Sequence, residues 1–349
     1  MSVGILGATG HTGRLLARAL HELGQPLVLF GRSQEKLNDL REMGETIVGS
    51  ALDVESLRPV FRRCPLVINC AGPYTELGWP AVQLAMEYRV DLWDLTGEQP
   101  FQLRCLELDA RLRMFDVAIA NAMGLEVLVS DCGAALLSEE LRGLHGEVER
   151  VDIVNKVRDF QSSKGSFESV LNILGRDTFA WRDGGLVPAR MGKPWRREGG
   201  RHLVWGPGVD ILTVARSTGA RQVEVWFDMP GWVAMGARAG SRSNKAVFGS
   251  RLGPALRKLG KRAPLDPQVD ADGGPWEIQV TVHGGGHSLS RTWVGRDPYG
   301  STAAITAWCA IERLAAGNRV RRGGLLSPSQ VVSPARFFEH LHPLIREQA

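Results

Sequence analysis

The stretch VGILGATGHTG, residues 3–13, decides the fold expected for this chain. Its first four apolar residues predict a short buried strand, and residues 12–23 follow with apolar side chains at helical spacing. Glycines between a strand and a helix permit a tight turn, the close approach of a pyrophosphate and close helix–strand packing. The helix amino terminus adds N–H groups and partial positive charge. We therefore predict a dinucleotide-binding loop, with a plain tight turn as the alternative. The loop residues are Gly7, Ala8, Thr9, Gly10, His11, Thr12 and Gly13.

Strands and helices alternate after this loop. Short apolar runs that predict strands are separated by segments with helical periodicity, which is typical of a parallel sheet covered on both faces. The second half of the chain instead has longer strands and a glycine turn at 284–286, which predicts an α+β region with a largely antiparallel sheet. The predicted strands are 27–30, 46–48, 66–70, 91–95 and 117–120 in the first half, and 147–157, 222–227, 276–282 and 288–294 in the second.

The end of the second strand indicates which dinucleotide binds. A site for NAD usually has Asp or Glu here to accept a hydrogen bond from the ribose 2′-hydroxyl. This chain has Gly31-Arg32-Ser33 instead, and the planar guanidinium of Arg32 suits a 2′-phosphate. Ser33 and Lys36 add further contacts. We predict NADP(H) over NAD(H); an ordinary surface role for Arg32 is the alternative.

Further cofactor contacts are expected from loops at the carboxyl ends of strands, where open α/β sheets bind ligands. We expect these loops to contact the ribose or the nicotinamide, although their glycines and proline are also turn formers. Asp53, after the third strand, approaches the adenine in one interpretation and caps the next helix in the other. The loop residues are Ala71, Gly72, Pro73 and Tyr74 after 66–70, and Thr96, Gly97 and Glu98 after 91–95.

Several chemistries are excluded by missing motifs. None of the three tyrosines is followed four residues later by lysine, as short-chain dehydrogenases require. GxSxG, HExxH and Walker motifs are absent, and the five cysteines lack CxxC spacing, so we expect neither a disulfide framework nor a metal site. Cys132 is interpreted as a buried, inert thiol rather than a nucleophile. The chemistry that these exclusions leave is hydride transfer without a covalent intermediate.

Four longer motifs point to a known family. The stretches GATGHTGRLLARAL (7–20), LFGRSQEKL (29–37), VINCAGPYTELGWPAVQLAME (67–87) and DLWDLTGE (91–98) resemble saccharopine dehydrogenase-like oxidoreductases, including the mycobacterial trans-acting enoyl reductases. The resemblance continues more thinly at 164–169 and in RDPYG, residues 296–300. It implies a Rossmann-type parallel sheet, an inserted α+β domain, and C-terminal helices that return to the Rossmann domain.

The resemblance also implies domain bounds and one departure. We expect a Rossmann domain at 1–123, an α+β substrate and dimerisation domain at 124–295, and a C-terminal helical segment at 296–349, in a homodimer. The family commonly has Gly-Phe-Asp-Ser-x-Pro-x-Asp where this chain has GLEVLVSD, residues 124–131. We expect this stretch to be a loop near the substrate, and its change indicates a divergent reaction or lost activity.

Positive charge is concentrated in residues 238–265, which hold eight Lys and Arg residues and no acid. One interpretation is a basic amphipathic lid that admits a hydrophobic or anionic substrate or rests on a membrane surface. The other is a core helix with a solvated basic face. No nucleic-acid-binding module is present. Arg14 and Arg18 stand where a signal peptide needs apolar residues, so we expect a cytoplasmic protein.

These observations predict an NADPH-dependent reductase acting on a C=N or activated C=C bond of a small or lipid-like substrate. Tyr74, at the cofactor edge, is the first candidate proton donor, and Asp131 is the second if burial raises its pKa. The alternative is a non-catalytic NADP(H)-binding sensor or scaffold. Weaker candidates for proton transfer or substrate binding are His283, His287, Lys156 and Arg158.

Overall fold

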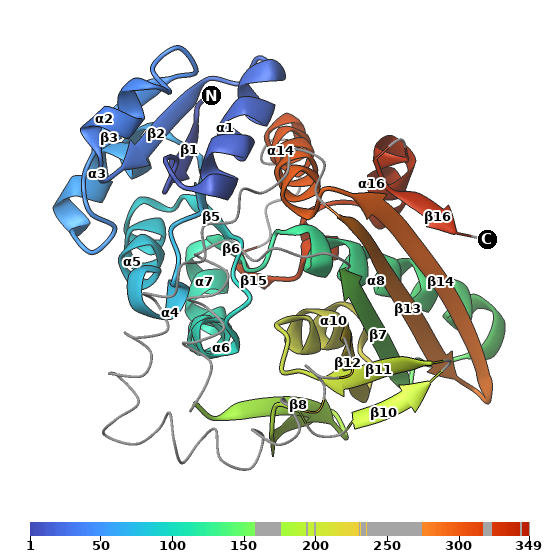
Figure 1. The fold of residues 1–349 in the computed structure, drawn as a ribbon. Helices are drawn as coiled ribbons and strands as arrows, with labels where there is room; N and C mark the ends of the chain where they lie inside the picture. Colours follow the sequence, from blue (N-terminus) through green and yellow to red (C-terminus); the bar gives the residue numbers. More distant parts are fainter. Residues whose placement is uncertain are drawn as a thin grey trace. The chain divides into compact units, whose positions relative to one another are not determined.

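The computed structural model describes residues 1–157, 176–192, 195–198, 200–229, 231, 235, 274–316, 323–342 and 344–348 (Figure 1). The chain divides into two compact units. Unit 1 comprises residues 1–96, 101–125 and 299–332, and unit 2 comprises residues 97–100, 126–298 and 333–349. The basic stretch 238–265, the segment 164–169 and Arg158 lie outside the described residues, so the predictions made for them stay predictions.

Unit 1 is built on a seven-stranded sheet in which every strand pair is parallel, with the order β15-β6-β5-β4-β1-β2-β3. This confirms the predicted Rossmann-type sheet. Strand order reverses between β1 and β4, and ligands of open α/β sheets bind at such a switch point. The strands are β1 (Val3–Leu6), β2 (Leu27–Gly31), β3 (Glu45–Val48), β4 (Leu66–Asn69), β5 (Asp91–Asp94), β6 (Ala118–Ala120) and β15 (Gly324–Leu326).

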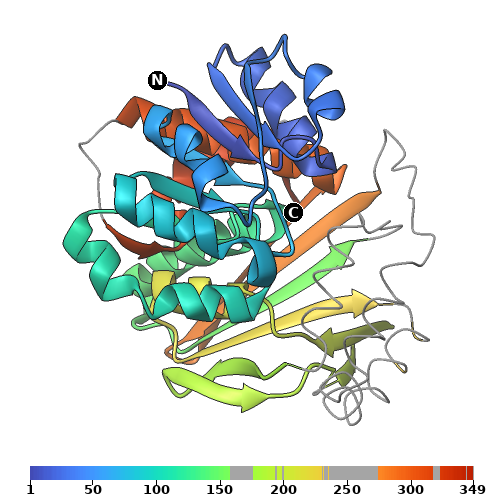
Figure 2. The ribbon, with the colours of Figure 1, turned by 90° about the vertical axis from the view of Figure 1, so that its left-hand side faces the viewer.

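Helices cover both faces of this sheet (Figure 2). The helix α1 illustrates why they form: Leu16, Ala17 and Leu20 recur at helical spacing and are buried against the sheet. Gly24, with φ +74°, takes the left-handed conformation that ends a helix. The helices are α1 (His11–Glu22), α2 (Gln34–Asn38), α3 (Val54–Arg63), α4 (Tyr74–Leu77), α5 (Trp79–Tyr88), α6 (Gln99–Leu106), α7 (Asp109–Phe115), α14 (Pro298–Ala316) and α15 (Pro328–Val331).

The C-terminal part of the chain is shared between the units. The helix α14 and the strand β15 belong to unit 1, where β15 pairs with β6. The sequence predicted only helices here, because three apolar residues are too few to show strand periodicity. Residues from Ser333 onward belong to unit 2 instead, where β16 pairs with β14. The segment expected at 296–349 is therefore divided at residue 332.

The described strands of unit 2 form a nine-stranded sheet, and among them only the β12–β7 pair is parallel, so the predicted largely antiparallel sheet is confirmed. Its main path is β10-β11-β12-β7-β13-β14-β16, with β8 beside β12 and β9 beside β8. The strands are β7 (Arg150–Val157), β8 (Thr178–Arg182), β9 (Gly185–Ala189), β10 (Trp195–Glu198), β11 (Arg201–Trp205), β12 (Gln222–Met229), β13 (Pro275–Gly284), β14 (His287–Arg296) and β16 (Arg346–Gln348).

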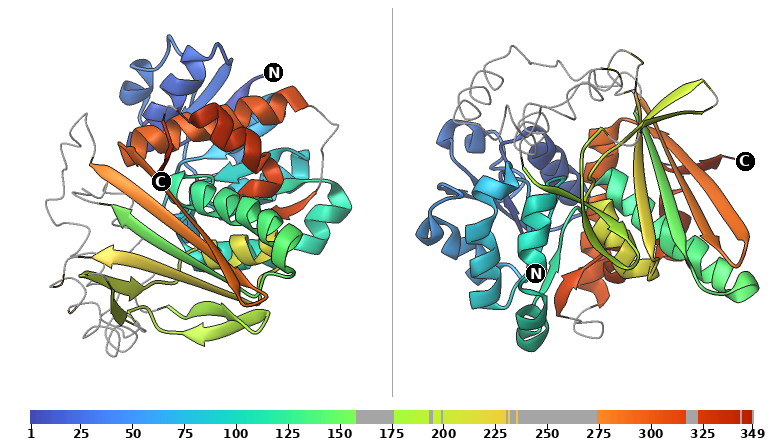
Figure 3. Two further views of the ribbon diagram at one scale, coloured as in Figure 1. Left: turned by 90° about the vertical axis from the view of Figure 1, so that its right-hand side faces the viewer. Right: turned by 90° about the horizontal axis from the view of Figure 1, so that it is seen from below.

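Unit 2 also contains the helices α8 (Leu125–His145), α10 (Asp210–Thr218) and α16 (Pro334–Leu341) (Figure 3). Close packing joins α8 to β14: a Cβ on Gly133 would lie 2.5 Å from the Trp293 indole. The predicted loop at 124–131 is wrong, because α8 begins at Leu125. The stretch has no proline, and Val127, Leu128 and Val129 are buried, so the helix continues through it.

All five cysteines are unpaired, and four of them are buried, including Cys132. No helix within the described ranges is long and apolar enough to cross a membrane.

Candidate dinucleotide-binding site

The loop between β1 and α1 has a conformation that only glycine accommodates. Gly7 has φ +74°, and a Cβ there would lie 2.9 Å from the backbone nitrogen of Ala71. A Cβ on Gly13 would lie 2.3 Å from the carbonyl oxygen of Gly7. Two backbone hydrogen bonds close the loop, from Gly10 N to Gly7 O (2.9 Å) and from Ala8 N to Phe30 O (3.0 Å). The glycine spacing therefore reflects close backbone approach and not only a turn.

The amino terminus of α1 is open to an anion. Gly10 is its N-cap and supplies no side chain, and the first turn of the helix contains no acidic residue. The first N–H groups of a helix lack partners inside the helix, so here they depend on solvent or a ligand. Gly10 and His11 are exposed, and Thr12 is half-buried behind them. This arrangement suits the negative charge of a pyrophosphate.

The end of β2 carries the predicted phosphate cations. Arg32 and Lys36 are exposed, and neither side chain forms an ion pair with any described residue. Ser33 caps α2, since its Oγ accepts a hydrogen bond from Lys36 N (3.3 Å). Gly31 lies under Thr9, whose side chain would be 3.0 Å from an added Cβ. The glycine loop and the β2 end are thus adjacent.

Arg14 was missed by the sequence analysis. Its guanidinium donates to Thr9 O (3.3 Å) and to Lys36 O (3.4 Å), and it forms an ion pair with Asp39 (3.3 Å). Arg14 therefore ties the glycine loop to the helix that carries Lys36. The position of Arg14 directly after Gly13 was the sequence signal for a role beside this loop.

Asp53 caps α3. Its carboxylate accepts a hydrogen bond from Glu55 N at 3.1 Å, so the capping interpretation of this residue is observed. The side chain is exposed, and its predicted approach to the adenine stays a prediction.

The loop after β4 lies against the glycine loop, as the contact between Gly7 and Ala71 shows. It is held by the Asn69 side chain, which accepts a hydrogen bond from Ala71 N (2.9 Å), and it contains a cis peptide bond between Gly72 and Pro73. The Tyr74 hydroxyl donates to Asn69 O at 3.1 Å, and Tyr74 is buried beside Phe101. This geometry gives Tyr74 a role in closing the loop; its role as a proton donor stays a prediction.

Asp94 organises the ends of β5 and β6. Its buried carboxylate accepts hydrogen bonds from Thr96 N (3.0 Å), Ala122 N (3.1 Å) and the Asn121 side chain. Ala122 has φ +61°, a left-handed conformation that costs free energy in a residue with a Cβ and persists here because Asp94 binds its N–H group. Asn121 and Ala122 were not predicted, because their partners come from another strand.

The remaining residues predicted after β5 belong to unit 2. Gly97 has open space around it, and Glu98 is fully buried. The neighbouring Gln99 side chain binds both backbone groups of Phe179, accepting from its N–H (2.8 Å) and donating to its carbonyl (2.9 Å). This part of the predicted cofactor loop is therefore anchored on β8.

Unit 2 contains a cluster of carboxylates from the first two turns of α8 and the start of α10. Ser217 donates to Asp131 (2.7 Å), and Ser130 donates to Asp210 (3.2 Å). Asp131, the second candidate proton donor, is fully buried, and its catalytic role stays a prediction. Burial raises the pKa of Asp210 to about 6. The pKa of Glu126 is raised to about 7 by loss of hydration around its carboxyl group and by the nearby charge of Asp210, although Glu126 as a whole is an exposed residue.

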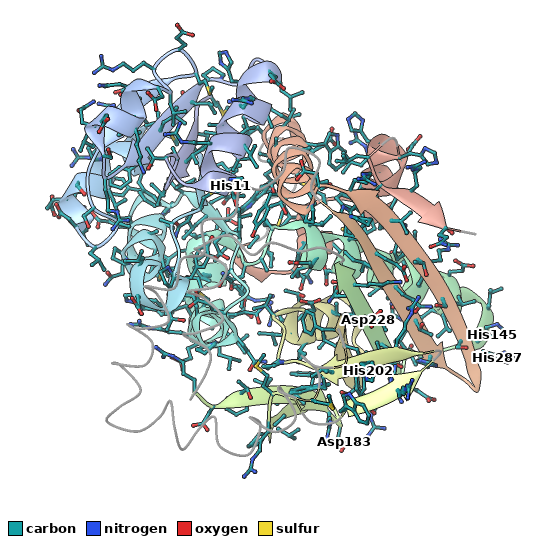
Figure 4. All side chains as sticks on the ribbon, in the orientation of Figure 1. His11, His145, Asp183, His202, Asp228 and His287 are labelled. Carbon is teal, nitrogen blue, oxygen red and sulfur yellow. The ribbon has the colours of Figure 1, made fainter. Side chains whose placement is uncertain are left out.

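Glu126 was missed by the sequence analysis. The signal was its place in residues 124–131, where the family pattern has its first Asp. The three weaker candidates of unit 2 that the structure describes each have a partner: Lys156 pairs with Glu277 (3.0 Å), His283 lies 3.0 Å from Asp152, and His287 stacks on His145 (Figure 4). Among the described residues, no group of three His, Cys, Asp or Glu side chains is placed to hold a metal ion.

Comparison with known proteins agrees with this geometry. Residues 7–87 match a family described as NAD(P)H-binding. The chain is 34% identical to a trans-acting enoyl reductase of Mycobacterium leprae over 161 residues, which are 43% of this chain and 38% of that protein. It is 25% identical to a saccharopine dehydrogenase-like oxidoreductase of Rattus norvegicus over 173 residues, which are 43% of this chain and 40% of that protein. The matched stretch thus spans less than half the length of these relatives.

Among solved structures, the chain resembles apo saccharopine dehydrogenase (L-Glu forming) from Saccharomyces cerevisiae, with a TM-score of 0.63 and 14% sequence identity. The match covers 99% of each chain, and it establishes a common fold. The predicted resemblance to saccharopine dehydrogenase-like oxidoreductases and trans-acting enoyl reductases is confirmed.

Proposed function

We propose that this protein is an NADPH-dependent oxidoreductase of the saccharopine dehydrogenase-like type. The observation that carries the proposal is the glycine loop, in which Gly7 and Gly13 admit no side chain and lead into an uncapped helix amino terminus. Such a loop binds the pyrophosphate of a dinucleotide. Arg32 and Lys36, exposed and outside any ion pair of the described residues, support a preference for the 2′-phosphate of NADPH.

NADPH supplies a hydride when it is bound. The protein must orient the substrate and deliver one proton, to nitrogen when a C=N bond is reduced or to carbon when an activated C=C bond is reduced. We propose that a small or lipid-like substrate carries this bond. Tyr74 and Asp131 are the proton donors predicted from the sequence.

Glu126 is a third candidate proton donor that the structure adds. It directly follows Leu125, the last residue of its stretch of unit 1, whose N–H donates to the Thr302 hydroxyl oxygen at 3.2 Å. A pKa near 7 lets a carboxylic acid give up a proton at neutral pH. Glu126 is exposed, whereas Asp131 is fully buried.

Cofactor preference is tested by fluorescence titration with NADPH and NADH. We expect tighter binding of NADPH, and we expect Arg32→Ala to remove most of the difference. Arg41→Ala, which removes another exposed arginine outside the β2 end, is the matched control. Tighter binding of NADH by the unmodified protein would contradict the preference.

Hydride transfer is tested with 4-deuterated NADPH and a panel of imines and enones. Stereospecific transfer of deuterium to one substrate supports the reductase, and substitution of Glu126, Tyr74 or Asp131 then identifies the proton donor. A non-catalytic NADP(H) sensor is the second candidate function. It is favoured by the engagement of Tyr74 and Asp131 in internal hydrogen bonds, and it predicts NADPH binding without deuterium transfer.

A further inference from the structure

Tyr299, from the late RDPYG motif, contacts the glycine loop. It lies in the first turn of α14, and its ring meets the imidazole of His11 edge to face, with centroids 4.9 Å apart and planes at 87°. His11 is the first residue of α1 and is exposed at the start of that helix (Figure 4). A residue distant in the sequence thus touches the helix terminus proposed to bind the cofactor.

The position of Tyr299 is set by the rest of α14. Near the other end of this helix, Arg313 binds Asp91 through two nitrogens at 3.1 and 2.8 Å, and both side chains are buried. In its middle, the Thr306 hydroxyl donates to Met123 O at 2.6 Å. Met123 follows β6 and Asp91 begins β5, so α14 starts at the carboxyl edge of the unit 1 sheet and ends at its amino edge. These contacts of α14 therefore place Tyr299 at the ligand-binding edge of the sheet without the help of the glycine loop.

A fixed contact on His11 matters because the loop around it is rich in glycine. Glycine backbones lose more conformational entropy on ordering than other residues, and a ligand that orders them binds more weakly. Aromatic pairs in edge-to-face geometry contribute stabilisation beyond their buried area. The Tyr299 ring restricts His11 and, with it, the first turn of α1 before a ligand arrives.

We propose that Tyr299 is a cofactor-positioning residue, which holds His11 and the amino terminus of α1 in the conformation that binds a dinucleotide pyrophosphate. The inference rests on the dinucleotide binding of the proposed function and adds a residue to it. Tyr299 acts through His11, so its effect belongs to the pyrophosphate end of the site and not to the 2′-phosphate end at Arg32 and Lys36.

The test uses the whole 349-residue chain and two probes, NADPH and adenosine 2′-monophosphate, which lacks the pyrophosphate. Tyr299→Leu should weaken NADPH binding about three- to tenfold, the range that loss of an aromatic pair produces. Tyr299→Phe keeps the ring and should bind NADPH within about twofold of the unmodified protein. Adenosine 2′-monophosphate should bind all three proteins equally. Tyr88→Leu, which removes a tyrosine that contacts Arg58 and Arg62, should leave both probes unaffected.

A double-mutant cycle tests whether the effect passes through His11. His11→Ala should weaken NADPH binding to a similar degree. The double variant should bind NADPH only slightly more weakly than the single variant with the lower affinity. Unchanged NADPH binding in Tyr299→Leu, an equal loss for adenosine 2′-monophosphate, or additive losses in the double variant would each overturn the inference. If the unmodified protein binds no NADPH, the proposed function itself fails, and this inference with it.

Discussion

The glycine loop of unit 1 and the carboxylate cluster of unit 2 use different parts of the chain. In the loop, the groups placed for a ligand are backbone N–H groups, and the side chains matter mainly where they are absent, at Gly7 and Gly13. In the cluster, Glu126, Asp131 and Asp210 offer side-chain oxygens, and the protein around them raises the pKa of two of them. The comparison separates a site that depends on backbone shape from one that depends on ionisation.

The largest effect is expected from the buried ion pair that joins α14 to β5 in unit 1. Arg313→Leu leaves Asp91 buried without its cation, and breaking a buried ion pair in this way costs about 3–5 kcal/mol. Urea unfolding measures this loss. Arg346→Leu, which removes an exposed arginine, is the control. A loss below about 1 kcal/mol, typical of a surface ion pair, would contradict the role assigned to this pair.

The next largest effect is a dependence of protein stability on pH, which the carboxylate cluster should show and the glycine loop should not. The pKa of Asp210 rises from 3.8 to about 6, so the folded protein holds this proton more tightly than the unfolded chain. The stability that this proton provides is complete below about pH 4 and is lost as the pH rises through about 6. Asp210→Asn should remove a pH-dependent change on the order of 2–3 kcal/mol between these values.

Unfolding of Asp210→Asn in urea at a series of pH values measures the change. Glu147→Gln, on an exposed side chain, should leave the pH profile as it is. Glu126→Gln should act in the same direction as Asp210→Asn, over a window that extends to about pH 7. A profile that Asp210→Asn leaves unaltered would show that the cluster does not differ from the loop in this respect.

A smaller effect is expected from one methyl group in the loop. Gly13→Ala forces Cβ against the Gly7 carbonyl, and overpacking of this kind costs about 1–3 kcal/mol. Because the loop must move to relieve the contact, NADPH affinity should fall by about tenfold, which corresponds to 1.4 kcal/mol. The control is Gly143→Ala on α8, where a Cβ meets no atom within 4 Å. That change should stabilise the helix by up to about 1 kcal/mol and leave NADPH binding unaltered.

The smallest effect is expected at Asp53, where it tests the helix cap against the predicted contact with the adenine. As an N-cap of α3, Asp53 should contribute about 1 kcal/mol, which Asp53→Ala removes and Asp53→Ser largely retains. Thermal unfolding measures this difference. NADPH titration of the same two variants decides between the interpretations: a loss of affinity shared by both would indicate contact with the adenine, and equal affinity would leave Asp53 as a cap alone.

Much of unit 1 could be predicted from the sequence because its signals are local. Leu16, Ala17 and Leu20 reveal a helix by their spacing, and Gly7, Gly10 and Gly13 reveal a backbone-built loop without knowledge of any distant residue. The stretch 124–131 shows the limit of such reasoning. A loop was expected from a family pattern, whereas three buried apolar residues without proline continue a helix.

The amino-acid sequence by itself determined the dinucleotide loop, the alternation that makes a parallel sheet, and the cations at the end of β2. The tertiary structure decided which distant residues meet: Asp94 with Ala122, Ser217 with Asp131, Arg313 with Asp91 and Tyr299 with His11. The physical reason is the range of the interactions. Helices, turns and glycine conformations depend on neighbours a few residues away, whereas buried hydrogen bonds, shifted pKa values and ring contacts depend on partners that only the folded chain brings together.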